Sequence, residues 1–226
     1  MTAQQTFQML SADKAVLVMI DHQAGLMLYP RDIDPLHLKN NAVALAKVAK
    51  MHGLPVVLSA AAQGPLGPIG PIIPEILDLF PDAPVIHRTK INSWHDPDFR
   101  AAVEATGRRQ VIIAGIDASF CAGLPAKSMA AEGYDVHHVV EASGNTSDLT
   151  LLTTVASLTQ AGVKCANWVE VACQLLADWA DEDKAQRLLA IYREHLPGWA
   201  MLGLIQEGAA DPAKFRGPAA RRGAAG

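Results

Sequence analysis

Short apolar runs alternate along the chain with longer segments of helical period, and this alternation narrows the choice of fold. The apolar runs lie at residues 15–20, 56–58, 84–87, 111–114, 136–140 and 163–166. Helical patterns occupy residues 36–51, 75–80, 97–105, 121–132, 149–160 and 170–179, and one more lies at 184–195. Parallel strands need crossover connections, and these connections cover the faces of the sheet. We therefore expect an α/β fold, with a parallel sheet between two layers of helices.

The composition excludes several classes of protein and several kinds of partner. Half of the 226 residues are hydrophobic and the net charge is only -4, which is unlike a disordered chain or a polyanion-binding protein. No apolar run approaches the roughly 18 residues of a membrane helix, and residues 1–14 lack the features of a signal peptide. We expect a cytoplasmic protein with a small-molecule substrate, and no nucleic-acid or membrane partner.

The chain divides into three parts by composition. Residues 1–180 carry the α/β pattern, residues 181–207 form a helical extension, and residues 208–226 read as a flexible basic tail rich in Ala, Gly and Pro. The apolar segment 199–205 exceeds what one small sheet needs to cover it. An exposed apolar segment favours a subunit interface, so we expect a homo-oligomer.

Three reactive residues follow the predicted strands. Asp21 follows the first strand, Lys90 the third, and Cys121 the fourth, where a helix begins. Ligands of open α/β sheets bind beyond the carboxyl ends of the strands, so these residues are expected to share one edge. A helix N-terminus and a nearby Lys both lower the pKa of a thiol, and a carboxylate can accept the thiol proton.

Each of these residues also has a structural interpretation. A Cys at a helix start often serves packing, an Asp after a strand often caps a helix, and a Lys in a loop is usually solvated. Cys165 and Cys173 are interpreted as packing residues. The three cysteines lack metal-ligand spacing and are expected to be free thiols.

Three motifs occur in an order and spacing that resemble a known family. They are Asp21-His22-Gln23 after the first strand, the segment 88–94 (RTKINSW), and the segment 111–121 (VIIAGIDASFC). The chain resembles the isochorismatase-like superfamily of cysteine hydrolases, which includes nicotinamidases and N-carbamoylsarcosine amidase. The resemblance runs from about residue 15 to residue 179, and is closest to bacterial small hydrolases of unassigned substrate.

This resemblance implies a three-layer Rossmann-like fold with six parallel strands in the order 3-2-1-4-5-6. It also implies Cys121 as the nucleophile, Asp21 as the general base and acid, and Lys90 as the cation that supports the thiolate. A cis peptide bond is implied between Ile116 and Asp117. The implied oxyanion donors are the backbone N–H groups of Asp117 and Cys121.

The turn before the nucleophile departs from the family pattern Gly-x-x-Thr-(Asp/Glu)-x-Cys-Val. Ala118, Ser119 and Ala122 occupy its positions, and Ala118 lacks the hydroxyl that usually supports the turn. Asp117 replaces a small apolar residue at the implied cis bond. Its carboxylate either opposes a developing oxyanion or points away and caps the helix.

The remaining site candidates concern the pocket and a metal. Gln23, Asn92, Trp94 and Phe120 are candidates for lining the pocket, although the two aromatic residues fit a packing role equally well. Nicotinamidases carry a metal-binding element after the second strand, but residues 59–74 contain no His or acidic residue. We expect no metal and no other cofactor.

The sequence thus favours a cysteine-dependent hydrolase of a small-molecule amide or related C–N bond, acting through a thioester intermediate. Two alternatives stay open. One is vinyl ether hydrolysis of the isochorismatase type, which proceeds without a catalytic Cys. The other is a catalytically weak or inactive binding or scaffold protein that keeps the fold.

Overall fold

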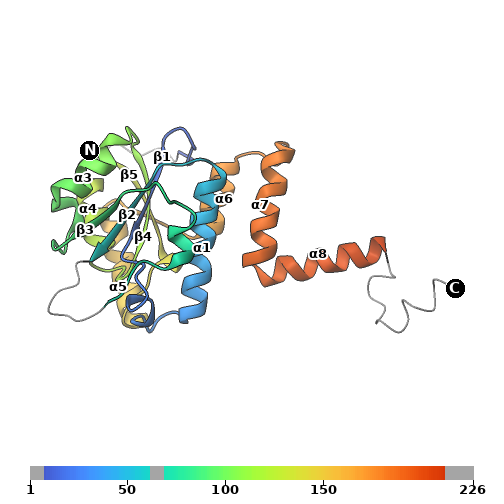
Figure 1. Ribbon diagram of the computed structural model, residues 1–226, viewed down its shortest axis with the longest axis horizontal. Coiled ribbons are helices and arrows are strands. Elements are labelled where there is room, and N and C mark those ends of the chain that lie inside the picture. The colour runs from blue at the N-terminus through green and yellow to red at the C-terminus, as the bar shows by residue number, and fades with distance from the viewer. Residues whose placement is uncertain (1–7, 62–68, 212–226) are drawn as a thin grey trace.

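The computed structural model describes residues 8–61 and 69–211, in which strands and helices alternate as expected (Figure 1). The strands are β1 (Ala15–Ile20), β2 (Val56–Ala61), β3 (Val85–Arg88), β4 (Gln110–Gly115), β5 (Asp135–Val139) and β6 (Lys164–Ala166). The helices are α1 (Pro35–Met51), α2 (Pro74–Leu77), α3 (Pro97–Ala105), α4 (Gly123–Ala131), α5 (Asp148–Gln160), α6 (Trp168–Leu176), α7 (Glu182–His195) and α8 (Pro197–Ala210). Short 3-10 helices, η1 (Leu26–Leu28), η2 (Ser93–His95) and η3 (Val140–Ala142), lie between them.

The six strands form one parallel sheet in the order β3-β2-β1-β4-β5-β6, which confirms the predicted fold class and strand order. The central strand β1 pairs with β2 on one side and with β4 on the other. Its last residue, Ile20, is in register with Ser59 and Gly115. The strand order reverses beside β1, so this is the part of the carboxyl edge where a ligand is expected.

Helices cover both faces of the sheet, and β1 is buried on both. Leu17 and Met19 belong to the apolar cluster shared with α1, α6 and α7. Val16 and Val18 belong to the cluster on the opposite face, which includes α3 and α4. A strand buried on both faces reads as a continuous apolar run, which is why β1 was predicted with its observed bounds.

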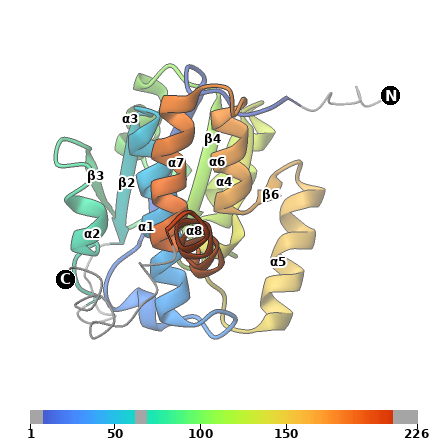
Figure 2. The same cartoon turned by 90° about the vertical axis from the view of Figure 1, so that its right-hand side faces the viewer.

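The C-terminal helices extend away from this layered body. Helix α7 packs on α1, whereas α8 contacts α7 and projects outward (Figures 1 and 2). Helix α8 continues through Ala210, two residues past the predicted start of the tail at residue 208. The rest of the predicted tail, residues 212–226, lies outside the described residues. Among the described helices none is long and apolar enough to cross a membrane.

Candidate active site

Asp21 directly follows β1, and its side chain is buried at the carboxyl edge of the sheet. Its φ is 59°, a left-handed conformation that residues other than Gly rarely adopt. Its N–H donates to the carbonyl of Ser59 at 2.7 Å, and its own carbonyl accepts the N–H of Gln23 at 2.7 Å. The side chain of Asp21 is fully buried. A carboxylate in such a place needs a compensating charge.

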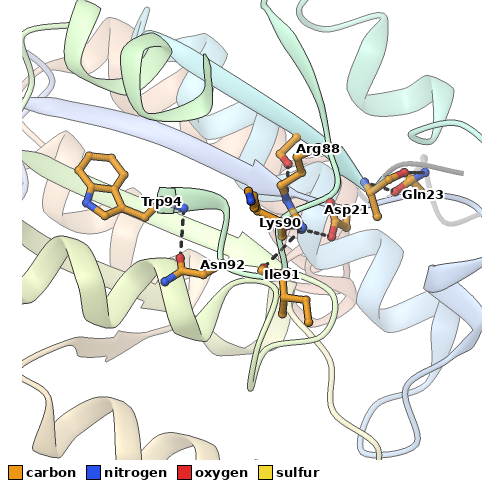
Figure 3. Close-up of polar contacts among 9 residues, drawn as sticks. Asp21, Gln23, Arg88, Lys90, Ile91, Asn92 and Trp94 are labelled. Atoms are coloured by element: carbon orange, nitrogen blue, oxygen red, sulfur yellow. Dashed lines mark hydrogen bonds and ion pairs between the residues drawn. The ribbon is translucent and has the colours of Figure 1, made fainter. Parts of the chain in front are cut away.

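Arg88 supplies that charge. It ends β3, and its Nη2 atom donates to Oδ2 of Asp21 in an ion pair (Figure 3). Its Nε atom donates to the hydroxyl of Ser59 at 3.0 Å, so the guanidinium spans β2 to reach β1. Arg88 is itself buried, and this makes it the cation held against Asp21.

Lys90 had been expected in this position, but its side chain is exposed. Its backbone carbonyl, rather than its ammonium group, takes part in the network by accepting a hydrogen bond from Nη1 of Arg88 at 2.5 Å. Arg88 is the last residue of β3, and its buried side chain pairs with Asp21, whereas Lys90 lies two residues past the end of the strand with its side chain exposed.

The turn between β4 and α4 carries Cys121. A Cβ atom on Gly115 would lie 2.6 Å from the carbonyl oxygen of Ile20 and 3.2 Å from Cβ of Ala122. Only Gly therefore allows the end of β4 to approach both β1 and the residue after Cys121. The peptide bond between Ile116 and Asp117 is cis, at the position that the family resemblance implies.

Backbone and hydroxyl groups hold this turn, although Ala118 lacks the hydroxyl of the family pattern. The N–H of Ala118 donates to the carbonyl of Gly144 at 2.8 Å. The N–H of Ser119 donates to Oδ1 of Asp117 at 2.6 Å, and the Ser119 hydroxyl also donates to this oxygen. Asp117 thus closes a turn ahead of α4, while its Oδ2 atom is buried with no hydrogen-bond partner among the described residues.

The thiol of Cys121 lies against the carboxyl of Asp21, and burial dominates the electrostatics of both. Burial raises the pKa of Asp21 to about 6, against the lowering effect of Arg88. Burial, and then the charge of Asp21, raises the pKa of Cys121 to about 12, although Arg88 and the N–H of Asp117 favour the thiolate. The lowered thiol pKa expected from the helix start and Lys90 is therefore not found. At neutral pH the arrangement holds a carboxylate base beside a protonated thiol.

The pocket candidates separate into different environments. Gln23 is buried, with its Oε1 atom accepting the N–H of Ala61 at 2.8 Å and its Nε2 atom donating to the carbonyl of Gly70 at 2.8 Å. It thus joins the ends of β1 and β2 to the segment before α2. Gln23 also borders an apolar cavity of about 320 Å³, with Ile72 and Val85 in its wall.

Asn92 and Trp94 serve the packing of the loop against α4. The side-chain amide of Asn92 donates to the Ser128 hydroxyl at 3.0 Å and accepts the N–H of Trp94 at 3.1 Å. The buried indole N–H of Trp94 donates to Glu132 at 2.9 Å. The indole also packs edge-on against Tyr134, with the ring centroids 5.4 Å apart. Figure 3 places Asn92 and Trp94 together, away from Asp21. Of the two interpretations of Trp94, the structure matches the packing one.

Two aromatic side chains remain partly exposed near the thiol. Phe120 precedes Cys121 and is 40% exposed. Tyr29, which follows η1, was not identified from the sequence. Burial, followed by the charges of Asp117 and Cys121, raises the pKa of its phenol. No sequence motif marks Tyr29, because its place depends on how the loop after β1 folds back.

Neither a disulfide nor a metal-binding cluster is found among the described cysteine, acidic and His side chains. All three cysteines are free, and Cys173 is exposed, which corrects its interpretation as a buried packing residue. Within residues 8–61 and 69–211, no group of three or more His, Cys, Asp or Glu side chains could hold a metal ion.

A family model and a curated relative both assign this chain to one family. The isochorismatase domain family matches residues 15–170. The probable hydrolase YcaC of Escherichia coli K12 is 40% identical over 198 residues, which cover 85% of this chain and 91% of the relative.

Two solved structures are similar over almost their whole length. The E. coli YcaC crystal structure, described as an octameric hydrolase of unknown specificity, has a TM-score of 0.86 at 38% identity, covering 91% of this chain and 100% of the other. The structure of YcaC from Pseudomonas aeruginosa, with hexane-2,5-diol and covalent acrylamide, has a TM-score of 0.84 at 38% identity. The match covers 90% of this chain and 98% of the other.

Proposed function

Since the chain belongs to the isochorismatase family of hydrolases, we propose that it hydrolyses a small-molecule amide or related C–N bond with Cys121 as the nucleophile. The observation that carries this proposal is the buried Asp21–Arg88 pair beside the Cys121 thiol. A carboxylate, a fixed cation and a thiol lie together at the carboxyl edge of β1, β3 and β4, which supports the proposed roles of base, counter-charge and nucleophile.

In the first half of the reaction, the Sγ atom of Cys121 attacks the substrate carbonyl while its proton passes to Asp21. Oδ1 of Asp21 suits this role, because it has no hydrogen-bond partner among the described residues while Oδ2 holds Arg88. The backbone N–H groups of Asp117 and Cys121 are the proposed donors to the oxyanion. Asp21 then returns the proton to the leaving nitrogen as the C–N bond breaks, and this leaves a thioester.

In the second half, Asp21 removes a proton from water as the water attacks the thioester carbonyl. The C–S bond breaks, the thiolate recovers the proton from Asp21, and the carboxylic acid leaves. Arg88 keeps Asp21 in its ionised form between these transfers, since an adjacent opposite charge favours the carboxylate. Lys90 has no part in this scheme, although the resemblance had assigned it the cationic role.

Two observations favour a thiol mechanism over the alternatives: the Cys at position 121, and a covalent compound in the structure of a relative. Isochorismatase-type vinyl ether hydrolysis does not need the Cys that stands here, and a binding protein would not need a buried acid–cation pair beside it. The P. aeruginosa YcaC structure holds covalent acrylamide. Acrylamide is both an electrophile toward thiols and a small amide, which fits a nucleophilic Cys121 in this chain.

We further propose that the protein is a homo-oligomer in the cytoplasm. The E. coli YcaC structure is octameric. In this chain α8 exposes five large apolar side chains, namely Trp199, Met201, Leu202, Leu204 and Ile205. A large apolar helix surface is normally buried, and a second copy would bury it. The three free cysteines fit a reducing compartment.

The experiment that tests the proposed reaction measures ammonia or amine release from a panel of small amides. The wild type is compared with Cys121→Ser and with Cys173→Ser as a matched control. Turnover in the wild type and in Cys173→Ser, with loss in Cys121→Ser, supports the proposal. Undiminished turnover in Cys121→Ser, or none in the wild type across the panel, contradicts it.

A further inference from the structure

The loop after β1 is fastened to the same residues as the nucleophile turn. Gly144 lies between them: its carbonyl accepts the N–H of Ala118, and Pro30 packs on its Cα. A Cβ atom on Gly144 would lie only 2.3 Å from Cγ of Pro30. One glycine therefore touches both the residue after Tyr29 and the turn that leads to Cys121.

A second anchor fixes the same loop. The N–H of Arg31 donates to the carbonyl of Asn145 at 2.8 Å. The carboxylate of Asp32 accepts the backbone N–H and the side-chain Nδ2 of Asn145, each at 2.8 Å. Asn145 is fully buried, so these bonds are shielded from water. The backbone around Tyr29 is thereby held in a set position relative to Cys121.

Tyr29 and Cys121 differ in their exposure to solvent. Tyr29 is 42% exposed, whereas Cys121 is only 9% exposed. Burial, and then the charges of Asp117 and Cys121, raise the pKa of the Tyr29 phenol, in agreement with a ring on the Cys121 side of this anchored loop. Phe120 adds a second partly exposed ring next to Cys121 in the chain.

We propose that the ring of Tyr29 forms one wall of the entrance to Cys121 and limits the size of the group that reaches the thiol. The inference rests on the proposed function and gives it a substrate class, namely compact amides without a bulky substituent near the carbonyl. Tyr29 acts here as a specificity-determining residue through its ring, and its hydroxyl is not required.

The test compares two reagents that share one reactive alkene, acrylamide and the bulkier N-benzylacrylamide. Their rates of addition to Cys121 are measured by peptide mass spectrometry in the wild type, Tyr29→Ala and Tyr29→Phe. The exposed Cys173 is the internal reference for reagent quality and folding. We expect Tyr29→Ala to raise the rate for N-benzylacrylamide about tenfold relative to acrylamide. Tyr29→Phe keeps the ring and is expected to hold the ratio within about twofold of the wild type.

The outcomes separate this inference from the proposed function. If Cys121 reacts but the ratio of the two rates is the same in Tyr29→Ala and the wild type, the inference alone is overturned. It is also overturned if Tyr29→Phe changes the ratio as much as Tyr29→Ala, because the hydroxyl would then be responsible. If neither reagent adds to Cys121 in the folded wild type or in either folded variant, the inference and the proposed nucleophile both fail.

Discussion

The guanidinium of Arg88 and the carboxylate of Asp21 form an ion pair that is closed to solvent, with the two residues 4% and 0% exposed. They come from β3 and β1, and the hydroxyl of Ser59 on the intervening strand accepts a further bond from Arg88. The pair therefore joins three strands at the carboxyl edge. Its charge balance sets the protonation of Asp21, the group on which the proposed chemistry depends.

Replacing Arg88 should affect both stability and activity, and Lys90 provides the matched control. Arg88→Met leaves Asp21 buried without a partner, which is expected to lower the free energy of unfolding by about 3–5 kcal/mol. It should also abolish most turnover. Lys90→Met, at an exposed position, is expected to change stability by no more than about 0.5 kcal/mol. Urea unfolding and amide hydrolysis measure both effects, and a larger loss in Lys90→Met would refute the assignment to Arg88.

The rate should depend on pH through Asp21. Its pKa of about 6 lies above the ordinary value, and the proposed base is the ionised form. Below pH 6 most molecules carry the protonated, inactive carboxyl, so kcat/KM should rise with pH between about 5 and 7 and then level off. A profile measured in constant ionic strength tests this. A flat profile across that range, or a rise only near pH 8–9 as for an ordinary thiol, would count against Asp21 as the base.

Asp117 should restrain the reaction by its charge. The variant Asp117→Asn keeps the Oδ1 acceptor for Ser119 but removes a buried negative charge close to Cys121 and the proposed oxyanion. We expect kcat/KM to increase about three- to tenfold, since removing a like charge stabilises a developing anion. Asp98→Asn, at an exposed position on α3, is the control. A decrease specific to Asp117→Asn would mean that its carboxylate assists the reaction.

The apolar face of α8 should hold the assembly together. Leu202→Asp combined with Ile205→Asp places two charges on exposed apolar positions of α8. Because a charge buried in an interface without a partner is costly, we expect a smaller particle in sedimentation velocity. Leu36→Asp, at an exposed apolar position on α1, should leave the assembly unchanged. An unaltered particle size in the double variant would show that α8 does not form the interface.

Sequence patterns predicted the fold well where burial alone determines the pattern. Strand β1 is buried on both faces, and α3 has Asp96 as its N-cap and Pro97 at its first position, so both were predicted with the observed bounds. Asp21 and Cys121 were proposed as site residues because they follow strands at the edge where the strand order reverses, and their side chains do lie together there.

The cation and the protonation states needed the three-dimensional structure. The motif of residues 88–94 contains two cations, and only the packing of the end of β3 shows that Arg88, rather than Lys90, faces Asp21. The raised pKa of Cys121 follows from burial among several strands and loops, which no local motif encodes. Likewise, the apolar segment 199–205 was expected within a helical extension, but only the structure shows that this helix projects away from the body.

The most direct test of the account is the rate of acrylamide addition to Cys121 in the wild type and in Asp21→Asn, followed by peptide mass spectrometry at pH 7. Cys173 serves as the reference in both proteins. A general base contributes about 100-fold or more, so we predict a fall of at least that size at Cys121 with no change at Cys173. Equal rates at Cys121 in the two proteins would contradict its activation by Asp21.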